Sequence, residues 1–281
     1  MHDLILLLLI GLVGGTLGGF LGIGGSLIFI PAMALFLNRG DEQQHLFQAS
    51  AMIINLFVSL SAVIRHLRAG VVRVDAFVRM MPAALVFIFV GVWASNHIDG
   101  TILQRVFAVF LGYVVLINLR KIVKQYRRQG WRGRSANSAA QKKADARRGT
   151  VTTPRSVFIG VIMGFVAGLL GIGGGGIAVS LQQVIFKNPL KQCIGTSSAV
   201  ICITAGFGAL YKNMTLGEHG YTFLNDAFPI VIALVPGAMI GAFVGATLTH
   251  KLPTLWVRAA FVLLLIVAGL KMSGLLQFHF A

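Results

Sequence analysis

Acidic residues are scarce in this chain. Only 8 of its 281 residues are Asp or Glu, and charged residues of both signs make up 11% of it. Because a soluble domain carries about 25% charged residues, this composition excludes a water-facing globular surface. The apolar segments offer no carboxylate ligands, which argues against a metal site and a cation substrate. All the acids fall in predicted loops or near segment ends, at Asp3, Asp41, Glu42, Asp75, Asp99, Asp145, Glu218 and Asp226.

Cysteine is nearly absent, and so is a processing signal. Cys193 and Cys202 are the only cysteines and lie in or near one apolar segment. A disulfide framework or a zinc site therefore has no support, and both residues are interpreted as free thiols. The first residues, MHDLILLLLI, lack a basic stretch, and no A-x-A-like site follows them. A cleaved signal peptide is therefore not predicted.

Apolar residues fill the chain instead. They make up 56% of it, and the mean hydropathy is +0.83. Runs of about 18 or more apolar residues are typical of membrane-spanning helices. We therefore predict an all-α, polytopic transmembrane helix bundle, an integral membrane protein surrounded by the lipid bilayer. The predicted segments are Leu4–Leu37, Leu46–Ile64, Ala76–Ser95, Ile102–Val123, Arg155–Phe186, Ile194–Tyr211, Phe223–Thr249 and Leu255–Gly274.

The chain carries an internal duplication. The stretch GLVGGTLGGFLGIGGS (Gly11–Ser26) aligns with GVIMGFVAGLLGIGGG (Gly160–Gly175), and QASA (Gln48–Ala51) overlays GTSS (Gly195–Ser198). Such self-similarity indicates a repeated structural unit. The predicted organisation is a first transmembrane repeat over residues 1–122, a basic linker over 123–153, and a second transmembrane repeat over 154–281.

Positive charge is concentrated between the repeats. The formal net charge is +16, and the stretch Arg120–Arg155 holds half of the 24 Lys and Arg residues. Nucleic-acid binding is one interpretation of such a run. A basic connection between spans is, however, what the positive-inside rule predicts for a cytoplasmic loop. We expect this loop to be cytoplasmic, in the plasma (inner) membrane of a bacterium, and we expect no nucleic-acid partner.

Each repeat begins with a segment that glycines interrupt. Interior helical glycines cost up to about 1 kcal/mol each relative to alanine. A straight helix over Leu4–Leu37 would be roughly 50 Å long, against a hydrocarbon core of about 30 Å. Two half-length helices that meet at the consecutive glycines fit this length better. The glycines spaced four apart, such as Gly11, Gly15 and Gly19, are interpreted as helix-packing positions.

Loop charge distinguishes two topologies. If each broken segment crosses the membrane once, the repeats run parallel and the basic stretch Lys187–Lys191 falls outside. If it returns to its own side, as a re-entrant hairpin or a pair of short spans, the repeats are inverted. The basic loops, among them Arg65–Arg73, then all lie inside. The sequence therefore favours inverted repeats, each with a Gly-broken first segment followed by three transmembrane helices.

The breaks predict a substrate site near the membrane midplane, as in transporters with discontinuous helices. Free amides and the positive dipole end of each second half-helix would face an anion, which glycines let approach closely. Hydroxyls at matching places would add neutral donors, although such groups often only bond their own helix. Two arginines near span ends, where long cations usually snorkel, are candidates for electrostatic attraction. The candidate substrate-binding residues are Gly24, Gly25, Ser26, Ser50, Gly173, Gly174, Gly175, Gly176, Thr196 and Ser197, and the two arginines are Arg105 and Arg258.

The motifs resemble those of the TauE/SafE sulfite exporter family over nearly the whole length. The resemblance rests on the duplicated LGIGGS and LGIGGGG motifs, on GTSS at Gly195–Ser198, on the prolines Pro82 and Pro236, and on the basic central loop. It implies a permease that exports sulfite, sulfoacetate or related organosulfonates, with some members proposed for uptake. The first copy has Ala49 where the second has Thr196, so a symmetric role for the two halves is not implied.

Other functions stay open at this point. An uptake permease for sulfate, thiosulfate or small carboxylates would use the same site by alternating access, and a non-transporting membrane scaffold would not use it. An intramembrane enzyme with Ser26 as nucleophile lacks a base at a recognisable spacing; no catalytic residue, metal or cofactor is predicted. Since no buried carboxylate relay is visible, the simplest energetics is downhill export along the membrane potential, with a proton carried by peripheral histidines as the alternative. A homo-oligomer is compatible with the sequence.

Overall fold

The chain folds as a bundle of helices. The computed structural model describes residues 2–37, 43–129, 150–249 and 254–272, and every regular element within these ranges is a helix. Six helices are long and apolar enough to cross a membrane, which confirms the predicted all-α transmembrane bundle. They are α3 (Gln44–Arg68), α4 (Val74–Asn96), α5 (Gly100–Gln129), α7 (Thr153–Leu170), α9 (Leu190–Met214) and α10 (Phe228–Leu248), the last preceded by a π-helical turn, η3 (Phe223–Ala227).

The two glycine-rich segments are each broken, as the sequence predicts. The first divides into α1 (His2–Leu21) and α2 (Ser26–Phe36), and the second into α7 and α8 (Gly175–Ile185). The eighth predicted segment forms α11 (Thr254–Met272). One detail differs from expectation, because α7 is by itself long and apolar enough to span a membrane rather than only half of one.

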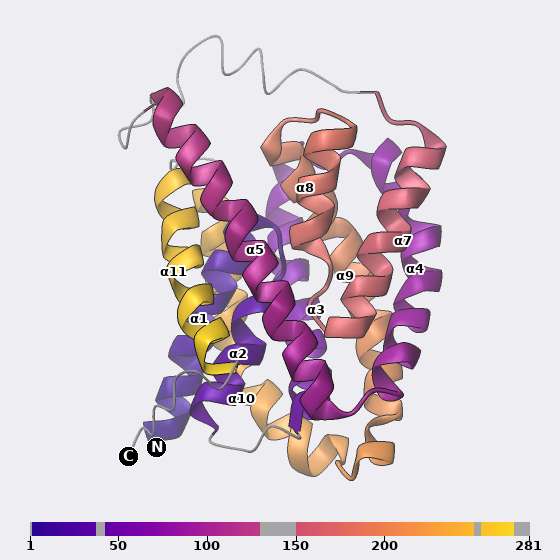
Figure 1. Ribbon diagram of the computed structural model, residues 1–281, viewed down its shortest axis with the longest axis vertical. Coiled ribbons are helices and arrows are strands. Elements are labelled where there is room, and N and C mark those ends of the chain that lie inside the picture. Colours follow the sequence, from indigo (N-terminus) through magenta and orange to yellow (C-terminus); the bar gives the residue numbers. More distant parts are fainter. Residues whose placement is uncertain (1, 38–42, 130–149, 250–253, 273–281) are drawn as a thin grey trace.

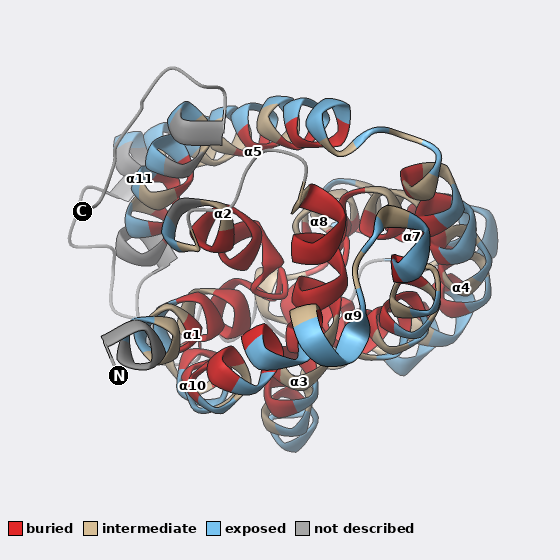
Figure 2. Ribbon diagram, turned by 90° about the horizontal axis from the view of Figure 1, so that it is seen from below, coloured by how far each residue is buried: buried red, intermediate tan, exposed pale blue. Residues whose placement is uncertain are grey.

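Helices of the two predicted repeats pack against each other in the bundle. Helix α1 of the first repeat packs along α10 of the second, and α7 of the second packs along α4 of the first. The central pair is α3 with α9, while α5 packs against α11 at one side (Figure 1). Figure 2 shows that buried residues gather on the faces of α1, α2, α3, α8 and α9 that point to the middle of the bundle. Neither predicted repeat therefore has a separate core.

Glycine stripes bring these helices into close contact. The glycine stripe of α7 lies against the backbone of α4, with Gly160, Gly164 and Gly168 facing Met80, Ala84 and Ile88 in turn. The contacts follow the same order along both helices. The helices therefore run parallel, and a Cβ atom on any of these glycines would overlap the facing backbone. The glycine stripe of α1 meets α10 in the same way, at Gly11, Gly15 and Gly19 against Leu234, Ala238 and Ala242. The spacing of four thus serves helix packing.

Replacing Gly164 with leucine should therefore destabilise the bundle. The side chain would meet the Ala84 backbone, which cannot move away without separating α4 from α7. Overpacking of this kind costs about 1–3 kcal/mol of unfolding free energy. Gly112→Leu in α5 is the matched control, because nothing lies within 4 Å of a Cβ atom there. Thermal unfolding in detergent should show a lower midpoint for Gly164→Leu only; equal midpoints for both variants would contradict the packing role.

Hydrogen bonds show which loops lie at the same end of the bundle. At one end Arg73 bonds Asn188 at 2.9 Å, and Arg79 bonds the Val151 carbonyl at 2.9 Å. At the other end His45 contacts the Ile98 carbonyl at 3.0 Å, and its ring stacks on that of His219 with centroids 3.6 Å apart. The first of these ends, with the α3–α4 turn and the α8–α9 loop, is called the basic end below; the second is called the histidine end.

Candidate functional site

The first helix break is held by one buried asparagine. At the break the backbone turns through Gly22 and Gly24, whose φ angles of 65° and 78° favour glycine. Helix α2 then begins at Ser26, and the Oδ1 atom of Asn55 on α3 accepts hydrogen bonds from the Gly25 amide at 2.6 Å and the Ser26 amide at 3.3 Å. These two amides were predicted to face an anion. In this structure they are already hydrogen-bonded to Asn55.

The second break has a different cap. Gly171, Gly173 and Gly174 all have φ angles near 70° (71°, 70° and 69°), and α8 starts at Gly175. Its N-cap residue is Gly174, which has no side chain to bond the first amides. Under the alignment of QASA with GTSS, the position equivalent to Asn55 is Cys202, which cannot offer an amide oxygen. The two predicted repeats therefore carry different side chains, an amide and a thiol, at equivalent sequence positions.

The breaks lie against each other and against the opposite repeat. A Cβ atom at Gly175 would come within 2.6 Å of the Gly22 carbonyl oxygen, and one at Gly173 within 2.8 Å of Asn55 Nδ2. That Nδ2 atom is buried and has no hydrogen-bond partner in the described part of the chain. Asn55 therefore sits between the two breaks, fixed to one by its oxygen and facing the other with its free N–H groups.

The predicted hydroxyls are buried but do not form one cluster. Ser26 Oγ donates to the Ala51 carbonyl at 3.2 Å, and Ser197 Oγ accepts from Gln182 Nε2 of α8 at 2.8 Å. Thr196 accepts a hydrogen bond from the Arg73 amide at 2.9 Å and so belongs to the basic end. Ser50 Oγ is buried with no partner among the described residues. Two of the four hydroxyls contact the helices that follow the breaks, since Ser26 is the first residue of α2 and Ser197 bonds to α8. Thr196 instead bonds to the backbone of the α3–α4 turn.

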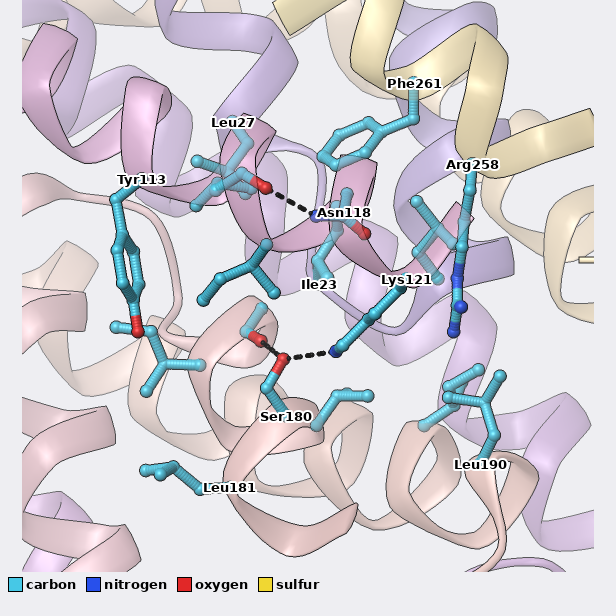
Figure 3. Close-up of a pocket in the computed structure, with 17 residues that line it drawn as sticks. Ile23, Leu27, Tyr113, Asn118, Lys121, Ser180, Leu181, Leu190, Arg258 and Phe261 are labelled. Atoms are coloured by element: carbon cyan, nitrogen blue, oxygen red, sulfur yellow. Dashed lines mark hydrogen bonds between the residues drawn. The ribbon is translucent and has the colours of Figure 1, made fainter. Parts of the chain in front are cut away.

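A small cavity adjoins both breaks. It has a volume of about 80 Å³ and lies between the half-helices α2 and α8 on one side and α5 and α11 on the other (Figure 3). Ile23 from the first break and Gly176 from the second are among the lining residues. Because liquid water occupies about 30 Å³ per molecule, this cavity holds a ligand of only a few heavy atoms.

Two cations and several neutral polar groups face this cavity. Figure 3 shows Lys121 extending into it from α5 and Arg258 from α11. Lys121 Nζ donates to Ser180 Oγ at 2.9 Å, and Asn118 also lines the wall. Arg258 is only 9% exposed and makes no hydrogen bond or ion pair with another described residue. No Asp or Glu is among the lining residues, so the cavity is positively charged and suited to an anion.

The predicted arginine pair is separated by the structure. Arg258 lines the cavity, whereas Arg105 is exposed on α5 and is not among the lining residues. Lys121 was not proposed from the sequence, because a lysine just before the basic linker resembles an ordinary snorkelling residue. Asn55 was also missed as a site residue; the signal was a strongly polar amide in the middle of a buried span.

An integral membrane protein with two interrupted helices beside a small cationic cavity has the features of a solute transporter rather than of an enzyme. Comparison with known families agrees. The model of the family described as "Sulfite exporter TauE/SafE" matches residues 7–272, and the chain belongs to this family. The family consists of membrane transporters, not enzymes.

Individual relatives carry similarly general names. The chain is 24% identical to "Probable membrane transporter protein YunE" of Bacillus subtilis, covering 95% of this chain and 96% of that protein. It is 25% identical to a "Probable membrane transporter protein" of Haemophilus influenzae, over 96% of this chain and 97% of that one. "Probable membrane transporter protein MamO" of Paramagnetospirillum magneticum is 23% identical over 96% of this chain, which spans only 44% of the length of MamO. No solved structure matches the chain.

Proposed function

We propose that this chain exports small sulfur oxyanions, such as sulfite or organosulfonates, across the plasma (inner) membrane. The observation that carries the proposal is the cationic cavity beside the two breaks. A guanidinium buried without a carboxylate is costly in the interior of a membrane protein, and an anion would offset that cost. The family description, which names sulfite, supports a sulfur oxyanion as the substrate.

The cavity offers the contacts that a compact oxyanion needs. Lys121 and Arg258 supply positive charge, and Arg258 can present two parallel N–H groups to two oxygens of one anion. Asn118, on the same helix as Lys121, adds a neutral donor, whereas the Ser180 hydroxyl accepts from Lys121 at 2.9 Å and donates to the Gly176 carbonyl at 3.0 Å. Leu21, Ile23 and Phe261 cover the rest with apolar surface. A pyramidal sulfite or a sulfonate head group would be held by the two positive charges and Asn118, against a wall that is otherwise apolar.

The breaks would act as the moving parts of alternating access. Their backbone leaves helical geometry only where protein surrounds it, as membrane structures require. The last helices of the two predicted repeats, α5 and α11, run in opposite directions along the bundle (Figure 1). This arrangement supports inverted repeats. Under that topology the residue ranges 1–122 and 154–281 are the two repeats that rock against each other.

The basic end would face the cytoplasm. It gathers Arg65, Arg68 and Arg73, and α5 leads from it into the basic linker. The positive-inside rule assigns such loops to the cytoplasm. Lys121 lies toward the linker end of α5, so the cavity would receive its anion from inside the cell. An anion that leaves a cell with a negative interior gains about 2.3 kcal/mol per charge per 100 mV.

Transport in proteoliposomes tests this function. Vesicles loaded with unlabelled sulfite should take up ³⁵S-sulfite by exchange, and an inside-positive membrane potential should increase the net uptake. Empty vesicles and vesicles with the Arg258→Met variant are the controls. If the vesicles exchange sulfate or a small carboxylate but no sulfite, those anions are the substrates instead. If wild-type vesicles exchange no labelled anion, a non-transporting scaffold becomes the better explanation.

A further inference from the structure

A second buried cation lies at the histidine end, away from the cavity described above. Lys212 of α9 is 0% exposed, and its Nζ atom has three hydrogen-bond partners. They are His45 Nδ1 of α3 at 2.9 Å, Ser95 Oγ of α4 at 2.9 Å, and Asn96 Oδ1 of α4 at 2.7 Å. The lysine therefore connects helices of both repeats.

The surrounding hydrogen bonds favour the protonated form of Lys212. Ser95 Oγ donates to Gln48 Oε1 at 2.9 Å, and Asn96 donates through Nδ2 to Thr215 at 2.8 Å, so each presents an acceptor to the lysine. His45 Nε2 lies 3.0 Å from the Ile98 carbonyl, which requires a proton on Nε2 and leaves Nδ1 as an acceptor. Three acceptors match the three N–H groups of a protonated lysine. No carboxylate forms an ion pair with it within the described ranges.

A polar cavity reaches two of the side chains that bond this lysine, although Lys212 itself does not line it. Its volume is about 520 Å³, and His45 and Asn96, two partners of Lys212, are part of its wall. The ring of His219 stacks on that of His45. The other titratable groups that line this cavity are Glu218 from the turn after α9, and His97, Asp99 and Tyr221 from the adjoining loops. Burial and then the Lys212 charge lower the pKa of His219, which Glu218 raises. Acids and histidines of this kind collect protons from solution.

The same network reaches the second helix break. Gln48, which accepts from Ser95, donates through Nε2 to the Leu169 carbonyl of α7 at 3.1 Å. A Cβ atom at Gly171, the residue that follows α7, would lie 2.9 Å from Gln48 Cβ. A change of charge at Lys212 is therefore connected through three hydrogen bonds to the element that would move during transport.

We propose that Lys212 and His45 form a proton-binding site that is loaded from the polar cavity at the histidine end and couples anion movement to a proton. The proposal rests on the exporter function above and names its coupling ion. The ammonium of Lys212 passes one proton to His45 Nδ1; the Nε2–H···O bond to the Ile98 carbonyl then breaks, and the Nε2 proton leaves to cavity water. The pair thereby changes from one positive charge to none, and it regains the charge when a proton returns by the same route.

An anion is a poorer occupant of this cavity. All three N–H groups of the lysine are already used, and Asp99 and Glu218 would repel an anion at the entrance. A metal ion is also a poor fit, since no group of three or more His, Cys, Asp and Glu residues with metal-binding geometry occurs among the described residues. The proton is the cation that a lysine–histidine pair can take up and release.

A pH gradient across proteoliposomes tests the coupling. The probe is ³⁵S-thiosulfate, whose charge does not change near neutral pH, with the membrane potential held at zero by potassium and valinomycin. Wild-type protein should accumulate the label against its own gradient, by up to about tenfold for each pH unit and coupled proton. Lys212→Met should exchange thiosulfate across the membrane but accumulate none.

Two further variants keep the test informative. His45→Gln preserves an acceptor for Lys212 and a donor for Ile98 but cannot titrate, so it should also lose accumulation even if Lys212→Met fails to fold. Lys187→Met, an exposed lysine at the basic end, is the matched control and should accumulate like wild type. Wild-type exchange that ignores the pH gradient, or accumulation by Lys212→Met equal to wild type, would overturn the coupling alone. Absence of any exchange by wild type would overturn the exporter function and the coupling with it.

Discussion

Replacing Arg258 with methionine should weaken anion binding by about 10- to 100-fold. A hydrogen bond to a charged group contributes about 1.5–3 kcal/mol, and 1.36 kcal/mol corresponds to a factor of ten. The same change should raise the thermal unfolding midpoint of the ligand-free protein, because it removes a buried charge that has no partner among the described residues. Titration of sulfite followed by the unfolding midpoint measures both effects on one sample.

Arg105→Met is the matched control for this prediction. Arg105 occupies the similar place in the first repeat but is exposed and does not line the cavity. Its loss should change neither the sulfite-induced shift nor the ligand-free midpoint. Lys121→Met should resemble Arg258→Met, since both cations face the same volume. Wild-type sulfite affinity in Arg258→Met would show that this cavity does not bind sulfite.

Replacing Asn55 with leucine should have the largest effect on stability. The amides of Gly25 and Ser26 would lose their common acceptor inside the bundle. A buried donor left without a partner costs about 1–3 kcal/mol, and two amides share Asn55. The expected result is a much lower unfolding midpoint together with loss of sulfite exchange, because the first break is no longer held in place.

Asn55→Asp separates the two roles of this side chain. The carboxylate keeps an acceptor for both amides, so the unfolding midpoint should stay nearer to that of wild type than in Asn55→Leu. Its negative charge beside the second break should nevertheless oppose passage of an anion and reduce exchange. Cys202→Ala, at the equivalent place in the second repeat, should leave both measurements close to wild type. A stable Asn55→Leu variant with full exchange would show that the asparagine does not hold the break.

Periodicity and glycine spacing were sufficient to predict most of the fold. Apolar runs located the helices to within a few residues, and the consecutive glycines located both breaks, because a positive φ angle is tolerated there. The i, i+4 glycines were correctly assigned to packing. What the sequence could not show is which helices pair, since the packing of α1 and α7 against helices of the other predicted repeat depends on tertiary contacts.

The candidate site was harder to predict for a physical reason. The sequence indicated free amides at the start of α2, but a side chain from α3 occupies them, and such a contact between distant residues leaves no local pattern. Lys121 and Arg258 line the same cavity only because α5 packs against α11. Lys212 was assigned to a loop from its neighbours in sequence, whereas a full extra turn of α9 carries it into the bundle.

The position of a bound anion tests the central claim most directly. Selenite is a heavier analogue of sulfite, and its selenium gives an anomalous signal in diffraction from crystals of the protein. We predict one strong anomalous peak in the cavity between Lys121 and Arg258, and the absence of this peak in crystals of Arg258→Met. A peak at the amides of Gly25 or Gly174 with an empty cavity, or no peak at a selenite concentration that stabilises the protein, would contradict it.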